Sequence, residues 1–242
     1  IGAQFQGEWA IYSCSMTSTA LANIAILYPQ NKELAIKFIG QIIDIAMSEE
    51  IREYDKLRWR EDPLDGIYGN LSHISYYSHL AWMISRYKQI GGDSKYDGQY
   101  HTLCRSMNRR IRQSPIMNLP TYPGESIYIP DMLVAIVALH NYASQYSGEY
   151  SSTVRLWIER AKKEWVDKET GLLASFLVQN GYTAEIEPPV KGSYSALNCY
   201  YLSLIDTEFA KEQYECLKKN FKQTFPFVGL KEYHNRTCWF GM

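Results

Sequence analysis

His79 is the residue of this chain best suited to transfer protons, because imidazole is the side chain whose ordinary pKa lies near neutrality. It follows Tyr76-Tyr77-Ser78 early in a helix-like segment, and Tyr76 shares its helix face three residues earlier. We expect His79 to act as a general acid or base, with Tyr76 orienting the imidazole or a substrate hydroxyl. The alternative is a hydrogen-bonded histidine of the core, which is how we interpret the other four histidines.

Carboxylates around a predicted helix start are candidates for a second proton-transfer group. Asp131 follows Pro130 at that start, where a carboxylate either stabilises the helix N-terminus or belongs to a site. Glu125 lies in the segment just before it. Either Asp62 or Asp65, taken with Glu125, would supply the paired carboxylates of a glycosidase. Solvated carboxylates without a catalytic role are the alternative interpretation of the same residues.

Aromatic side chains accompany these carboxylates in the segments between predicted helices. The chain contains 20 tyrosines, 8 phenylalanines and 6 tryptophans. We predict that a group of such residues binds substrate: Trp59, Asp62, Tyr76, Tyr122, Tyr128 and Tyr194. Rings and carboxylates together suit a small neutral molecule, either a sugar or an apolar alcohol. The alternative is that these rings only cover the ends of helices.

Apolar residues recur at helical spacing through most of the sequence and predict an all-α fold. The predicted helices cover residues 9–28, 32–47, 74–87, 98–112, 131–146, 152–165, 194–204 and 208–221. Alternation with a period of two is confined to short pieces such as residues 173–178, which predict a small hairpin closed at Asn180-Gly181.

The links between the predicted helices alternate strictly in length. Short turn-forming links lie at residues 28–31, 91–94, 147–149 and 206–207, and long links at residues 50–71, 113–130 and 166–193. This alternation is typical of helical hairpins stacked into an α/α solenoid or a closed α/α toroid. All long links then fall at one end of the molecule, where we expect the site.

We treat residues 1–242 as one domain, and we expect both ends to be cuts in a longer polypeptide. The chain opens with Ile1 rather than Met, and its last residues include Trp239, Phe240 and Met242, which are apolar residues of the kind that continue into structure. A toroid made of these hairpins would therefore be incomplete in this chain.

Composition and missing motifs exclude several classes of function. With 25 basic and 26 acidic residues the formal charge is −1, which argues against nucleic acid or an anionic membrane as partner. No apolar run approaches the roughly 18 residues of a membrane span. Five dispersed cysteines without CxxC spacing do not predict a zinc site. Without a GxGxxG, Walker or HExxH motif, we expect no cofactor and no metal.

The chain resembles the linalool dehydratase/isomerase family over about residues 5–225. The shared pattern includes Trp59-x-Glu61-Asp62, Tyr76-x-x-His79-Leu80 opening a helix, and Asp167-x-Glu169-x-Gly171. The resemblance implies an (α/α)6 toroid whose cavity catalyses the addition or removal of water and the migration of a double bond, without a cofactor. It also implies a possible homo-oligomer and favours a periplasmic or secreted location.

The family's catalytic residues carry over only in part. In this chain its tyrosine falls on Tyr12 and its histidine on His79. Its two cysteines fall at about Thr121 and Pro130, which are not cysteines, and we expect Glu125 or Asp131 to act in their place. A carboxylate-rich loop makes the pocket more polar, so a polyol or sugar-like substrate is expected rather than a terpene alcohol.

These observations predict a cofactor-independent lyase, hydratase or isomerase that acts on a small hydroxylated substrate. The catalytic residues would be His79, Tyr12, Asp131 and Glu125. A carbohydrate-active enzyme of the α/α-toroid class, either a glycosidase or a sugar epimerase, is the first alternative. A sugar-binding protein without catalytic activity is the second.

Overall fold

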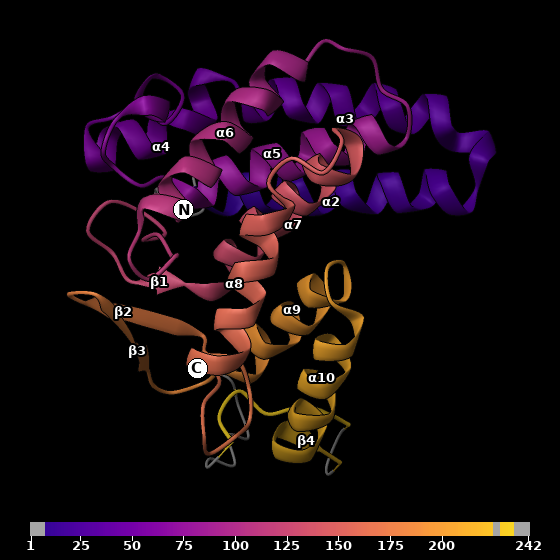
Figure 1. Cartoon of the computed structure of the whole chain (residues 1–242). Coiled ribbons are helices and arrows are strands. Elements are labelled where there is room, and N and C mark those ends of the chain that lie inside the picture. Colours follow the sequence, from indigo (N-terminus) through magenta and orange to yellow (C-terminus); the bar gives the residue numbers. More distant parts are fainter. Residues whose placement is uncertain (1–7, 225–227, 235–242) are drawn as a thin grey trace.

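The computed structural model describes residues 8–224 and 228–234, and these residues form the predicted all-α fold. The main helices form four antiparallel hairpins, and within each hairpin a short link joins the two helices (Figure 1). The pairs are α2 (Glu8–Leu27) with α3 (Lys32–Ala46), α5 (Ile74–Gln89) with α6 (Asp97–Gln113), α7 (Ile129–Gln145) with α8 (Ser151–Glu164), and α9 (Gly192–Ser203) with α10 (Thr207–Phe221). Each of the eight predicted helices corresponds to one of these elements.

One helix lies where the sequence pattern predicts an irregular link. Helix α4 (Glu49–Trp59) has glutamates in its first turn and Lys56 and Arg58 in its last, which complements the helix dipole. It ends at Arg60, whose backbone is left-handed with φ of 58°. Apolar periodicity misses this helix because charge rather than an apolar face supports it. Two short 3₁₀ helices, Pro29–Asn31 and Asp65–Tyr68, complete the helical elements.

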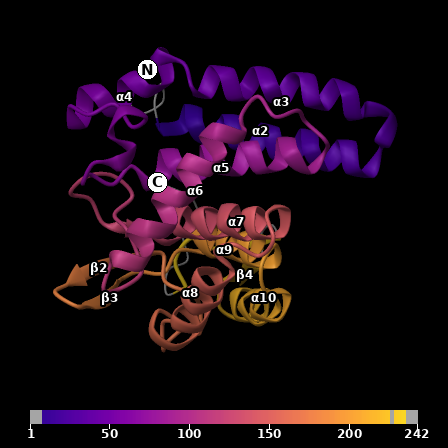
Figure 2. The same cartoon turned by 45° about the horizontal axis from the view of Figure 1, so that its top comes forward.

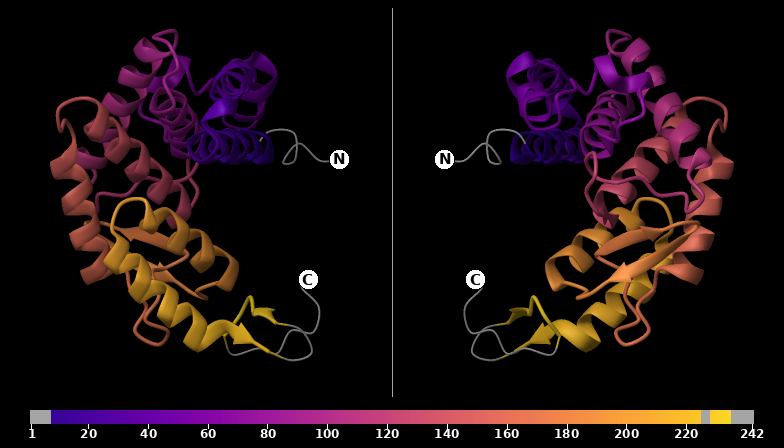
Figure 3. Two further views of the ribbon diagram at one scale, coloured as in Figure 1. Left: turned by 90° about the vertical axis from the view of Figure 1, so that its right-hand side faces the viewer. Right: turned by 90° about the vertical axis from the view of Figure 1, so that its left-hand side faces the viewer.

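The hairpins follow one another in chain order and form an open arc (Figure 2, Figure 3). Helices α2, α5, α7 and α9 contact one another in succession, and their partners lie outside them. Helix α5 is buried from Ile74 to Tyr87, because helices pack against it on all sides. Within the described residues the arc does not close into a ring, so the toroid stays a prediction.

The long links lie on one side of the molecule, the left in Figure 1, as the alternation of link lengths predicts. Two of them share a small antiparallel sheet with the order β1-β2-β3, made of β1 (Ile127–Tyr128), β2 (Phe176–Asn180) and β3 (Thr183–Glu187). Asn180 pairs with Thr183, so the predicted hairpin is present and turns at Gly181-Tyr182. A second pair, β4 (Lys222–Gln223) with β5 (Gly229–Leu230), follows α10.

Candidate active site

Three predicted catalytic residues meet where the inner helices approach the long links. Helix α2 supplies Tyr12, α5 supplies His79 and α7 supplies Asp131. The Tyr12 hydroxyl donates a hydrogen bond to Oδ1 of Asp131. The Tyr12 and His79 rings lie 4.2 Å apart between centroids, and Nε2 of His79 is 3.5 Å from the same Asp131 oxygen. Residues 119 positions apart in the chain thus share one polar contact.

Burial separates the roles of these three side chains. His79 and Asp131 are 0% exposed, so neither can touch a ligand in the present arrangement. Tyr12 is partly buried, and its pKa is raised well above the ordinary value by burial first and by the charge of Asp131 second. The phenol therefore keeps its proton near neutral pH and is available as a hydrogen-bond donor. The sequence predicts His79 as the general acid or base; it does not line the cavity that Tyr12 reaches, so in this arrangement it can act on a ligand only through Tyr12.

A cavity of about 710 Å³ adjoins Tyr12. It is formed by the start of α2, the link before α7, strand β2 and the start of α9. The lining residues are Glu8, Trp9, Tyr12, Thr121, Gly124, Glu125, Ser126, Tyr128, Phe176, Ser193, Tyr194 and Leu197. Half of these twelve residues are aromatic or aliphatic. The lining is therefore more apolar than we expected from the carboxylate-rich loop that stands in place of the family's cysteines.

One wall of the cavity is a cluster of three rings. Tyr128 lies 5.1 Å from Phe176 and 4.9 Å from Tyr194, and the last two are 5.7 Å apart, measured between ring centroids. The β1–β2 pairing places Tyr128 opposite Phe176. Tyr128 and Tyr194 are therefore at the cavity, where the sequence places them, whereas Phe176 escaped prediction because it lies in a strand of mixed pattern.

Glu125 is a carboxylate that reaches the cavity surface. It lines the cavity and forms an ion pair of 3.0 Å with Arg58 from α4, with both side chains partly exposed to solvent. Glu125 thus lies on the same cavity as Tyr12 but is held by a different element. A site with a proton donor and a separate carboxylate can carry out two proton transfers on one small molecule.

Two predicted binding rings do not line this cavity. Trp59 and Tyr122 stack on each other with 4.3 Å between centroids and 10° between planes. The Tyr122 hydroxyl donates to Oγ of Ser75 at 3.4 Å, and that serine donates to the Tyr12 hydroxyl at 3.5 Å. Burial, and next the charge of Asp131, raise the pKa of Tyr122. These rings cover the end of α5, which is the alternative interpretation given above, and Tyr122 supports Tyr12 from behind.

Tyr76 and Asp62 also lie elsewhere than predicted. The Tyr76 hydroxyl donates to the carbonyl of Ala46 at 2.8 Å, because a helix surrounded on all sides directs that ring toward α3 rather than toward His79. Asp62 accepts from Arg52 and from the backbone N–H of Leu64, and so shapes the turn after α4. Neither residue lines the cavity.

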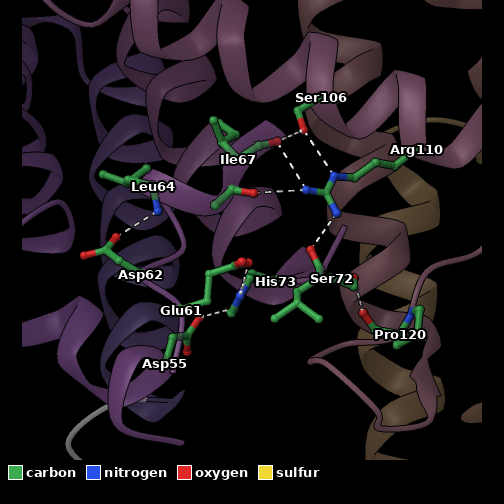
Figure 4. A network of polar contacts seen from close by, with 12 residues as sticks. Asp55, Glu61, Asp62, Leu64, Ile67, Ser72, His73, Ser106, Arg110 and Pro120 are labelled. Atoms are coloured by element: carbon green, nitrogen blue, oxygen red, sulfur yellow. Dashed lines mark hydrogen bonds and ion pairs between the residues drawn. The ribbon is translucent and has the colours of Figure 1, made fainter. Parts of the chain in front are cut away.

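The carboxylates of the first long link form a structural network (Figure 4). Buried His73 lies between Asp55 at 2.8 Å from Nδ1 and Glu61 at 3.2 Å from Nε2. Arg110 of α6 donates to the carbonyls of Ile67 and Leu71 in the same link. The acidic side chains thus bind His73 at the start of α5, and the backbone carbonyls of the link bind α6 through Arg110.

The glycosidase pairing predicted from the sequence is not assembled. Asp65 begins a 3₁₀ helix, and neither it nor Asp62 lines the cavity with Glu125. The carboxylate residues that do line it are Glu8 and Glu125.

Two serines around the polar contact were missed by the sequence analysis. Oγ of Ser15 lies 2.6 Å from Nδ1 of His79, and Ser75 contacts the Tyr12 hydroxyl. The sequence feature that could have identified Ser15 and Ser75 is a small polar residue on the buried face of an otherwise apolar helix. Ser18 and Thr19 share this feature and have no hydrogen-bond partner for their hydroxyls in the described part of the chain, so the feature alone does not identify the site.

No group of three or more potential metal ligands occurs in residues 8–224 and 228–234. Scans against protein-family models and against curated proteins find no match for this sequence.

Helix α2 is the one described helix that is long and apolar enough to cross a membrane by length and composition, contrary to the expectation that no such run exists. Six of its residues are buried against the other helices, as in a core helix: Ile11, Ser15, Ser18, Thr19, Ala22 and Ala25. It is a weak candidate, and the described residues contain no clear membrane span.

Proposed function

We propose that the protein is a cofactor-independent acid–base enzyme of the lyase, hydratase or isomerase type that acts on a small hydroxylated molecule. The observation that carries this proposal is the hydrogen bond from Tyr12, at the cavity surface, to the fully buried Asp131 beside His79. A phenol that is hydrogen-bonded to a buried carboxylate, with an imidazole beside that carboxylate, can deliver a proton and have it replaced from behind.

Elimination of water illustrates the roles of the residues. The C–O bond of the substrate breaks, and the departing hydroxyl takes the proton of Tyr12 to leave as water. Burial makes a Tyr12 phenolate costly, so a proton returns to it from the side of Asp131 and His79. Glu125 removes a proton from the neighbouring carbon, whose electron pair forms the double bond. The reverse sequence adds water, and elimination followed by addition at another carbon is an isomerisation.

The cavity favours a substrate with an apolar face and at least one hydroxyl. Its volume of about 710 Å³ is within the usual range for small-molecule sites. The ring cluster of Tyr128, Phe176 and Tyr194 provides an apolar wall, and the hydroxyls of Thr121 and Ser126 line the same space. These features favour alcohols and polyols of modest size as substrates.

The test is a panel of small alcohols, polyols and the corresponding alkenes incubated with the protein in D2O. Proton NMR detects water addition or removal and deuterium incorporation at carbon. Tyr12→Phe, which removes only the hydroxyl, is expected to lower turnover by about 10²–10⁴-fold, the usual contribution of a general acid. Tyr68→Phe is the matched control, because Tyr68 is exposed and lies outside this cavity. Equal turnover by wild type and Tyr12→Phe would refute the assignment.

A carbohydrate-active enzyme is the second candidate, because two carboxylate residues, Glu8 and Glu125, line one cavity with an aromatic wall. Aryl glycosides in the same panel test it. Release of the aryl group that requires Glu125 but not the Tyr12 hydroxyl would favour this candidate. Saturable binding of sugars without any turnover would instead indicate a binding protein.

A further inference from the structure

The hydroxyl of Ser15 is placed to control which nitrogen of His79 carries a hydrogen. Ser15 is fully buried on α2, one turn after Tyr12. Its Oγ donates to the backbone carbonyl of Tyr12 at 3.0 Å and lies 2.6 Å from Nδ1 of His79. A serine hydroxyl has one hydrogen to donate and can accept others. When that hydrogen stays on the Tyr12 carbonyl, Nδ1 of His79 is the donor in the second contact.

The opposite tautomer fits these contacts less well. Hydrogen on Nε2 alone would require Ser15 to donate to Nδ1 and give up the Tyr12 carbonyl.

With Nδ1 protonated, Nε2 of His79 and Oδ1 of Asp131 face each other in a buried space. Two lone pairs at this distance repel unless a proton lies on one of the two groups. The same Asp131 oxygen already accepts from Tyr12, and Oδ2 of Asp131 has no partner in the described residues. Nε2 of His79 and Asp131 can therefore share one proton behind Tyr12.

We infer that Ser15 is a positioning residue that holds hydrogen on Nδ1 of His79 and thereby leaves Nε2 able to share a proton with Asp131 behind Tyr12. This inference rests on the proposed function for its catalytic meaning, whereas the protonation pattern itself can be measured without any substrate. Ser15 contacts neither the cavity nor a ligand position, so it acts only through His79.

The test is two-bond ¹H–¹⁵N correlation NMR of the full chain labelled at its histidine nitrogens. The His79 signals are assigned by their loss in His79→Asn. We expect the wild type to carry hydrogen on Nδ1, either as the Nδ1–H tautomer or as imidazolium. Ser15→Ala is expected to shift His79 toward the Nε2–H tautomer. Ser18→Ala is the matched control, since Ser18 is equally buried on α2 and its hydroxyl has no partner in the described residues.

Two results would overturn the inference: a wild-type spectrum with an unprotonated Nδ1, or a Ser15→Ala spectrum equal to that of the wild type. Far-UV circular dichroism verifies that both serine variants are folded. If Tyr12→Phe has already disproved the catalytic proposal, the spectra still decide the role of Ser15. If turnover is found, Ser15→Ala should lower kcat at least about tenfold and displace the pH profile, with KM unchanged and Ser18→Ala neutral.

Discussion

At the scale of single residues, Tyr12 connects the cavity to buried acid–base groups. Its hydroxyl accepts from Ser75 and donates to Asp131, and Tyr122 donates to Ser75 in turn. A hydrogen-bond chain of this kind fixes the direction of the phenol. Because three of its groups come from different inner helices or links, small shifts between helices would alter the direction of the bond and hence proton delivery.

Asp131→Asn tests the electrostatic part of this contact. The Asp131 charge and its hydrogen bond both raise the pKa of Tyr12, after the larger effect of burial. Replacing the carboxylate by an amide of the same shape should therefore lower the pKa of Tyr12 while leaving it above the ordinary value. Ultraviolet titration of the variant at 295 nm, with the Asp131→Asn/Tyr12→Phe double variant subtracted, isolates this phenol. An unchanged titration would show that the two groups do not interact in solution.

Sequence reasoning predicted Tyr12, His79 and Asp131 as catalytic residues, and the structure brings these three side chains together with Tyr12 at the cavity. Residue types and helix positions predict which side chains approach one another, whereas exposure depends on how closely α5 is surrounded. Tyr76 illustrates this, since its helix position places it one turn from His79 while its hydroxyl bonds to Ala46 on α3. Ser15 was beyond prediction because its role depends on the distance to a ring 64 residues away.

At the scale of elements, the short link between α5 and α6 depends on close packing of glycine against a ring. Gly91 has φ of +87°, and a Cβ on Gly92 would overlap the ring of Tyr87. The Tyr87 hydroxyl donates to Asp93 at 3.1 Å, which holds the ring in that position. The hairpin turn therefore has little room to adjust.

Gly92→Ala should destabilise the protein by about 1–3 kcal/mol, because the ring or the backbone must move. Gly98→Ala, in the first turn of α6, meets nothing within 4 Å and should stabilise the protein by about 0.5 kcal/mol through its higher helix propensity. Urea unfolding followed by circular dichroism measures both. Equal midpoints for the two variants would contradict the proposed packing of Tyr87.

The elements themselves were largely predictable, for a physical reason. Helices that bury one face carry apolar periodicity, and all eight predicted segments became helices. Helix α4 buries only Tyr54 and Asp55, so its sequence lacks the apolar periodicity of the other helices. Its presence reorients the first long link, which explains why Asp62 and Trp59 were assigned to the site and lie elsewhere.

At the scale of the whole molecule, buried tyrosines make the fold sensitive to alkali. Burial is the largest cause of the raised tyrosine pKa values, and it raises the pKa of Tyr96 and Tyr142 to about 12. The groups with larger shifts in the same direction include Tyr12, Tyr76, Tyr77, Tyr100, Tyr122, Tyr128 and Tyr201.

Stability should therefore fall steeply above about pH 10. There the unfolded chain loses phenolic protons that the folded chain retains, so the free energy of unfolding decreases by about 1.4 kcal/mol per pH unit for each such tyrosine. Below this pH the contribution is fully present. Urea midpoints measured from pH 8 to 12, together with absorbance at 295 nm, should show helix loss and tyrosine ionisation in one transition. Ionisation of most tyrosines near pH 10 with intact helices would contradict the burial described here.

The cavity is assembled from residues as distant in sequence as Trp9 and Leu197, with Glu125 and Phe176 between them. No single hairpin supplies enough of the lining residues to form the cavity. A partly folded chain can therefore have most of its helices and still lack the ligand-binding cavity. Ligand affinity is in this way coupled to the final docking of all four helix pairs, and a bound molecule would protect even distant amides from hydrogen exchange.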